Sequence, residues 1–198
     1  MSTLHASSRQ SSAVKLGQDM LEREQVSAAT PDWNRERCLG FWDPSRRLLR
    51  SIRSYQKWKG RGLPWRWLSK YWVLQFNFWS VVTGADIPLN CEIGGGLLLT
   101  HPNGVVIFPD AVIGPNCQIF QQVTIGTGGP KPGAPVLGGH VDVGAGAKIL
   151  GGVRVGDHAL IGANAVVLED VPPGATAVGI PARIVRIREH AELLRELS

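Results

Sequence analysis

Two residues have the types and the spacing of a proton-transfer pair. His101 lies beside the turn-forming run Pro102-Asn103-Gly104, and Asp86 lies 15 residues before it. A neutral imidazole can take a proton from a hydroxyl, and a carboxylate bound to its far ring nitrogen fixes the tautomer. The pair could therefore activate a hydroxyl group for attack. On residue types alone, His101 could equally be a surface residue of the turn, and Asp86 could cap the element that follows.

An aliphatic residue returns every six positions through residues 87–172, and this repeat must position the pair. A small or medium apolar residue follows four positions later, and Gly often comes directly after the aliphatic residue. Neither a helical period of about 3.6 nor a hairpin with a two-residue turn gives this pattern. The repeat predicts a mainly β fold, a parallel β-helix with three hexapeptides per coil. The aliphatic residues are Ile87, Ile93, Leu99, Ile107, Ile113, Ile119, Ile125, Leu137, Val143, Ile149, Val155, Ile161 and Val167.

Two interruptions of the repeat are the expected places of function, because a solenoid carries function on segments that protrude from its rigid coils. The first adds two residues between Leu99 and Ile107, around His101. The second is the loop 127–136.

The segment before the repeat is basic. Residues 1–85 contain 14 Lys and Arg against 6 Asp and Glu, whereas residues 86–182 contain 3 against 7. Apolar spacing predicts helices near 48–55 and 65–82. We expect four regions: a disordered N-terminus over 1–30, a basic, Trp-rich helical segment over 31–85, the β-helix over 86–182 and a short C-terminal tail helix over 183–198.

Four tryptophans of the helical segment, Trp65, Trp67, Trp72 and Trp79, are expected to cover the open end of the solenoid and to bind neighbouring subunits. A basic aromatic helix also suits an anionic lipid surface, so peripheral membrane contact through residues 57–82 is an alternative. No nucleic-acid-binding module is recognisable. No signal peptide and no apolar run of about 18 residues is present, so we expect a cytoplasmic protein, with the inner face of the membrane as the alternative.

The cysteines and histidines do not have the spacing of a metal site or a disulfide framework. Cys91 and Cys117 fall at inward small positions of the repeat, and His140 and His158 fall at solvent-facing positions. A metal-dependent solenoid enzyme of the carbonic anhydrase kind needs three histidines at coil spacing, which this chain lacks. We therefore expect no metal.

Four motifs cover about half of the chain. They are D-I-P…IGGGLLLTH-x-x-GVVI, A-x-IG-x-N-x-x-I-x-Q-x-VTIG, VGAGAKILG-x-x-x-VG and IGANAVV-x-x-DVPPG-x-x-x-x-GIPARIV. In them the chain resembles the serine O-acetyltransferase family of hexapeptide-repeat acyltransferases, close to the shorter polysaccharide-pathway members. The resemblance implies a left-handed β-helix that transfers acetyl from acetyl-CoA to a hydroxyl. Asp86 and His101 match the catalytic Asp and His of that family in type and in spacing.

The resemblance also implies a binding site for the co-substrate and an assembly. The family forms trimers with active sites between neighbouring prisms, so we expect a homotrimer or a dimer of trimers. No metal is implied. The residues expected along the CoA arm are Gly126, Thr127, Gly128, Lys131, Ala145, Gly162, Ala163 and Arg183, with Lys131 and Arg183 facing the phosphates.

Two departures from the family bear on the acceptor. Serine acetyltransferases usually carry Asp before the catalytic His and an Arg-His pair in the loop, where the Asp meets the amino group of serine and the Arg its carboxylate. Thr100 and Gly133-Ala134 stand at these places here. Because unpaired charges in a closed pocket are costly, we expect a sugar or exopolysaccharide hydroxyl, contacted by Thr100 and Asn103. Serine acetylation in cysteine biosynthesis is the alternative, and a non-catalytic β-helix scaffold is a further one.

Overall fold

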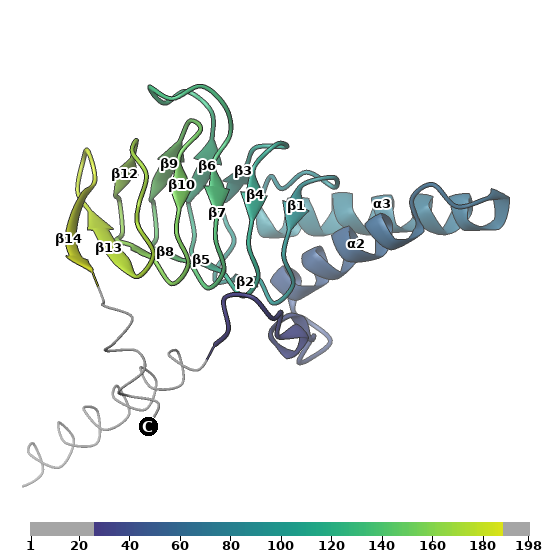
Figure 1. Ribbon diagram of the computed structural model, residues 1–198. Coiled ribbons are helices and arrows are strands. Elements are labelled where there is room, and N and C mark those ends of the chain that lie inside the picture. Colours follow the sequence, from purple (N-terminus) through teal and green to yellow (C-terminus); the bar gives the residue numbers. More distant parts are fainter. Residues whose placement is uncertain (1–25, 188–198) are drawn as a thin grey trace, which may run out of the picture.

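The computed structural model describes residues 26–187, a three-faced parallel β-helix with a pair of helices at one end (Figure 1). A 3₁₀ helix, η1 (Trp33–Glu36), leads into α2 (Pro44–Trp58) and then α3 (Leu63–Thr83). Asp43 accepts a hydrogen bond from the Arg46 N–H as the N-cap of α2. Gly84 ends α3 in the left-handed region at φ 64°, which glycine adopts without strain. The helices predicted near 48–55 and 65–82 lie within α2 and α3.

Each coil gives one short strand to each of three faces. The first face contains β1 (Glu92–Ile93), β4 (Val112–Ile113), β7 (Val136–Leu137) and β10 (Arg154–Val155). The second contains β2 (Leu98–Leu99), β5 (Gln118–Ile119), β8 (Asp142–Val143), β11 (Leu160–Ile161), β13 (Ala175–Val178) and β14 (Arg183–Ile187). The third contains β3 (Val106–Ile107), β6 (Thr124–Gly126), β9 (Lys148–Leu150) and β12 (Val166–Val167). Within each face the strands of the coils pair in parallel, so the predicted β-helix is confirmed.

The interior of the coils is the core of the protein. Every aliphatic residue of the hexapeptide repeat is buried, from Ile87 at one end to Val167 at the other. The small residues four positions later are buried too, including Cys91 and Cys117. Strand residues that precede the aliphatic one face outward, as in Val106, which is 40% exposed. The sixfold period therefore reports the direction of each side chain correctly.

The register between coils shows where the extra residues are taken up. Ile93 pairs with Ile113, a step of 20 residues, whereas Ile107 pairs with Ile125, a step of 18. The two extra residues are thus absorbed in the turn that contains His101. Ile113 then pairs with Leu137, and the longer step of 24 accommodates the protruding loop after β6.

Helix α2 closes the open end of the solenoid. Leu48, Leu49 and Ile52 are at most 1% exposed and belong to the same core as the coils. The Gln56 amide donates to the carbonyls of Leu89 and Cys91, which satisfies backbone groups of the first coil.

The predicted covering of this end by tryptophans holds for one of the four. Trp79 is 7% exposed, whereas Trp72 is half-buried and Trp67 is 74% exposed. The side chain of Trp65 lies outside the described residues. The reason is that α3 packs on the far side of α2, so most of its tryptophans do not reach the coils. Among the described residues no helix is long and apolar enough to cross a membrane.

The two ends of the described chain also differ from the expectation. Residues 183–187, where a tail helix was predicted to begin, form strand β14, which pairs antiparallel with β13. This segment alternates basic and β-branched residues, and it covers a sheet edge that would otherwise be unpaired. The rest of the predicted tail helix lies outside the described residues, as does most of the segment 1–30.

Candidate active site

His101 lies at the corner between the second and third faces, in the turn that joins β2 to β3. Its φ is 52°, in the left-handed region, and its side chain is exposed. Thr100, directly before it, is still held in the sheet by donating its N–H to the Ile119 carbonyl at 2.9 Å. The imidazole therefore leaves a rigid strand at a sharp bend and faces solvent. This suits a group that must meet a bound hydroxyl.

Asp86 begins the third face immediately after α3. Its N–H donates to the Val105 carbonyl at 2.8 Å, and its carbonyl accepts from the Ile107 N–H at 2.9 Å. The backbone of Asp86 thus extends the third face by one bridge beyond β3, and its side chain is exposed. This confirms its position on the layer next to the turn that holds His101.

The end of α3 and the His101 turn are packed together. The Gly104 N–H donates to the Gly84 carbonyl at 2.8 Å. The Asn103 amide nitrogen lies 2.8 Å from where a side chain on Gly84 would begin, so only glycine fits there. Asp86 is two residues beyond Gly84. Within the described residues no hydrogen bond joins the side chains of Asp86 and His101, so their pairing stays a prediction.

Thr100 has a partner that the sequence did not reveal. The Gln118 side-chain amide, one coil further on in β5, donates to the Thr100 hydroxyl at 3.2 Å. Both side chains lie on the outer side of the second face, beside the corner that carries His101. The surface next to the imidazole is therefore polar and uncharged at this point.

The residues expected along CoA divide between two corners of the prism. Ala145, Gly162 and Ala163 lie at the same corner as His101, on successive coils. The segment from Gly126 to Lys131 lies at the next corner, between the third and first faces. There the Gly151 N–H donates to the Gly126 carbonyl at 2.9 Å, which ties the base of the loop to the following coil. One chain therefore presents the imidazole and the loop on opposite edges of its third face.

The two cations expected to face the phosphates differ in their surroundings. Arg183 is exposed at the start of β14. The Lys131 ammonium forms an ion pair with Asp170 at 2.9 Å, and both side chains are about half exposed. A hydrogen bond from the Arg154 N–H, followed by the one from Lys131, holds the pKa of the Asp170 carboxyl below its ordinary value. A phosphate would have to compete with Asp170 for Lys131.

Other titratable groups lie away from this region. The Nδ1 atoms of His140 and His158 are 2.9 Å apart, at the corner between the first and second faces. Burial raises the pKa of Cys91 to about 11 and that of Cys117 to about 12, so neither thiol is a nucleophile at neutral pH. The part of the chain that the structure describes contains no cluster of side chains suited to a metal ion.

Comparison with known proteins places this geometry in context. No family model matches the chain. The serine acetyltransferase of Synechococcus elongatus is 44% identical over 107 residues, which are 53% of this chain and 44% of that protein. The chloroplastic serine acetyltransferase 1 of Arabidopsis thaliana is 45% identical over 107 residues, which are 53% of this chain and 34% of that protein. The chain thus spans less than half the length of these relatives.

Solved structures agree with this result. The serine acetyltransferase from Brucella abortus in complex with coenzyme A superposes with a TM-score of 0.62 at 31% identity, over 74% of this chain and 57% of that one. The soybean enzyme complexed with serine gives 0.60 at 36% identity, over 72% and 57%. The β-helix is a hexapeptide-repeat domain of the serine acetyltransferase type. This serine acetyltransferase-type domain carries the predicted fold class, and the resemblance of the motifs is confirmed.

Proposed function

We propose that the protein is an acetyl-CoA-dependent O-acetyltransferase. The observation that carries the proposal is the similarity of the β-helix to serine acetyltransferases, one of them solved with coenzyme A. The position of His101 and Asp86 on adjoining layers of the first irregular coil supports it. A scaffold without activity would have no need of an exposed imidazole at a tightly fixed bend.

In the proposed reaction, His101 takes the proton of the acceptor hydroxyl while the oxygen attacks the thioester carbonyl of acetyl-CoA. The tetrahedral intermediate collapses, the carbon–sulfur bond breaks, and the imidazolium returns the proton to the leaving thiolate of CoA. Asp86 accepts a hydrogen bond from the second ring nitrogen of His101, which fixes the tautomer and stabilises the charged ring. The reaction needs no metal ion.

The site requires a second copy of the chain in this proposal. His101 and the loop after β6 lie at different corners of one prism, with the third face between them. In a homotrimer, or a dimer of trimers, a neighbouring prism brings its own loop towards His101. The CoA arm then runs along the small residues Ala145, Gly162 and Ala163, and Arg183 is the better placed of the two cations for its phosphates.

The comparisons favour serine as the acceptor over the sugar or exopolysaccharide hydroxyl that the sequence suggested. Every relative compared above is named a serine acetyltransferase, and one structure is described as complexed with serine. We therefore take serine as the first candidate. A neutral hydroxyl acceptor is a second candidate, because the Thr100–Gln118 pair and Gly133-Ala134 offer no charge for the amino and carboxylate groups of serine.

Release of free CoA thiol from acetyl-CoA tests the activity. We expect His101→Ala to lower kcat by about 10²–10⁴-fold, the usual contribution of a general base, and Asp86→Asn to lower it less. His158→Ala is the matched control, because it removes an imidazole from another corner, and it should keep wild-type turnover. Near-normal turnover of His101→Ala would remove the proposed mechanism.

The acceptor is tested by comparing L-serine with neutral hexoses at equal acetyl-CoA. Two missing charge-assisted hydrogen bonds, at about 1.5–3 kcal/mol each, would weaken kcat/KM for serine by about 10²–10⁴-fold relative to an enzyme that has them. Efficient, saturable serine turnover with no hexose turnover would establish serine. Better turnover of a hexose would establish the neutral acceptor.

A further inference from the structure

Helix α3 carries an apolar stripe that no described element covers. The stripe consists of Trp67, Tyr71, Leu74, Phe78 and Val81, which are 74%, 50%, 66%, 52% and 84% exposed. Its members are spaced four, three, four and three residues apart. Figure 1 shows why they are uncovered: the α2–α3 pair projects from the β1 end of the solenoid, away from the coils. The opposite side of α3, including Trp79, packs against α2 and the core.

The spacing of the stripe specifies what kind of surface it fits. Alternating steps of four and three give an average of 3.5 residues, the period at which a helix keeps one seam facing another helix. In such a seam each side chain inserts between side chains of the partner that have the same period. A helix that is apolar on nearly all sides is normally buried. The stripe is therefore suited to a helical partner.

The charge around the stripe argues that this partner is α3 of a second copy. Between Trp67 and Thr83 the one charged residue is Lys70, at the rim, and no acidic residue occurs. Two copies can meet along the stripe without burying a charge. An anionic lipid surface, in contrast, would draw on a basic rim, and most basic residues of this segment, such as Arg50 and Lys57, lie on α2.

The exposed area is large enough for a stable contact. A fully covered aromatic side chain buries about 150–250 Å². Three aromatic and two aliphatic side chains at these exposures therefore offer on the order of 500–700 Å² per copy. Paired stripes would bury over about 1,000 Å² in total, the size at which a specific interface becomes credible. Trp42, 65% exposed and stacked on Trp79 with 5.6 Å between ring centroids, extends the apolar surface at the base of α3.

We propose that the protein self-associates through this stripe, with α3 of one copy packed along α3 of another. The contact is separate from the prism-to-prism contact of the proposed active site, and it does not rest on acetyl transfer. It would join two chains, or two assemblies of chains, through the helical pairs that project from their ends.

Mass measured by light scattering on the full chain tests the proposal. Leu74→Glu/Phe78→Glu places two carboxylates in the seam at positions exposed in one chain, so folding should survive. We expect the mass to fall at least twofold relative to wild type. Val185→Glu is the matched control, because Val185 is a 63% exposed residue of β14 far from α3, and its mass should equal that of wild type. An unchanged mass in the double variant would overturn the proposal.

A cross-link provides a direct second measurement. Leu74 is the central member of the stripe, so it meets its own copy whether the two helices run parallel or antiparallel. Under oxidation, Leu74→Cys in a Cys38→Ser background should give disulfide-linked dimers, and Val185→Cys in that background should not. Absence of the Leu74→Cys dimer would contradict the proposal. So would a monomeric wild type that floats with phosphatidylglycerol vesicles through the stripe, because lipid would then be the occupant.

Discussion

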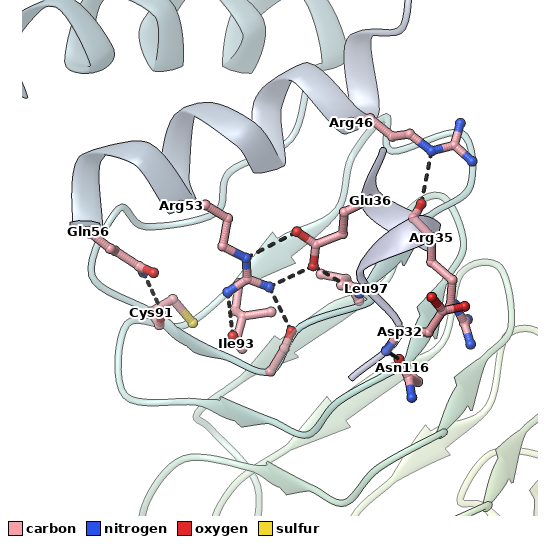
Figure 2. A network of polar contacts seen from close by, with 11 residues as sticks. Asp32, Arg35, Glu36, Arg46, Arg53, Gln56, Cys91, Ile93, Leu97 and Asn116 are labelled. Atoms are coloured by element: carbon pink, nitrogen blue, oxygen red, sulfur yellow. Dashed lines mark hydrogen bonds and ion pairs between the residues drawn. The ribbon is translucent and has the colours of Figure 1, made fainter. Parts of the chain in front are cut away.

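Arg53 is the residue whose loss should destabilise the fold most clearly. It extends from α2 beneath η1 and donates to both carboxylate oxygens of Glu36, at 3.2 and 2.8 Å, and to the carbonyls of Ile93 and Gly94 (Figure 2). Its guanidinium also lies 5.5 Å from the centre of the Trp33 ring. The side chains of Arg53 and Glu36 are only 20% and 8% exposed. One guanidinium thus joins η1, α2 and the first coil.

Arg53→Met keeps most of the chain length and removes all of these donors. The Glu36 carboxylate would remain buried with the Leu97 N–H, at 3.1 Å, as its one described donor. Breaking a buried ion pair from one side costs about 3–5 kcal/mol, and the partial exposure of Arg53 places the loss near 3. At about 2–4 °C per kcal/mol for a chain of this size, Tm should fall by about 6–12 °C.

Two variants make the measurement decisive in thermal unfolding followed by circular dichroism. Lys131→Met breaks an ion pair whose side chains are about half exposed, worth about 0–1 kcal/mol, and should shift Tm by less than about 4 °C. Adding Glu36→Gln to Arg53→Met removes the stranded charge and should recover part of the lost stability. If Arg53→Met costs no more than Lys131→Met, or if the double variant is less stable than Arg53→Met, the reasoning is wrong.

Three further predictions follow from buried and capping groups. Asn116→Gly keeps the left-handed backbone but removes three hydrogen bonds to residues 27–32, so limited proteolysis within that segment should speed up at least tenfold, equivalent to about 1.4 kcal/mol. Because burial raises the pKa of Cys91 and Cys117 to about 11 and 12, one thiol, Cys38, should react with an aromatic disulfide reagent in the folded protein, and all three after unfolding; fast reaction of a second thiol would contradict this. Burial opposes ionisation of Asp43, but hydrogen bonds from neighbouring donors outweigh it and lower its pKa. The stabilisation by Asp43, about 0.5–2 kcal/mol against Ala, should therefore be complete above about pH 4 and vanish as pH falls through the lowered pKa, which chemical unfolding at pH 7 and pH 3 would measure.

The coils could be predicted from the sequence because their period and their burial are the same signal. Each inward side chain is fixed by local backbone geometry, so counting in sixes identifies Ile119 or Val143 as core residues without knowledge of the rest of the fold. Counting also locates the two places where the period fails. The turn around His101 and the loop after β6 were found in this way, and the register between coils shows that the extra residues fall there.

Contacts between elements could not be predicted in this way. The apolar stripe of α2 was visible, but which of the two helices closes the solenoid depends on how the pair packs, and the tryptophans of α3 gave the wrong emphasis. The Thr100–Gln118 pair spans a step enlarged by the two extra residues, so an 18-residue spacing does not reveal it. Lys131 meets Asp170 only because the loop folds back across later coils. The strand at 183–187 forms because β13 offers an edge, which no local preference records.

The arrangement of the chain separates stability from chemistry. Coils with a step of 18 residues stack uniformly, and their interiors contain aliphatic and small side chains alone, so they can hold a fixed frame without any residue of the candidate site. The two coils with a longer step carry the exposed imidazole and the loop, at neighbouring corners rather than the same one. A single prism therefore fixes each half of a site rigidly but does not join them. Association of chains is the step that would complete the site, and the uncovered stripe on α3 gives the same chain a second surface through which assembly can be controlled.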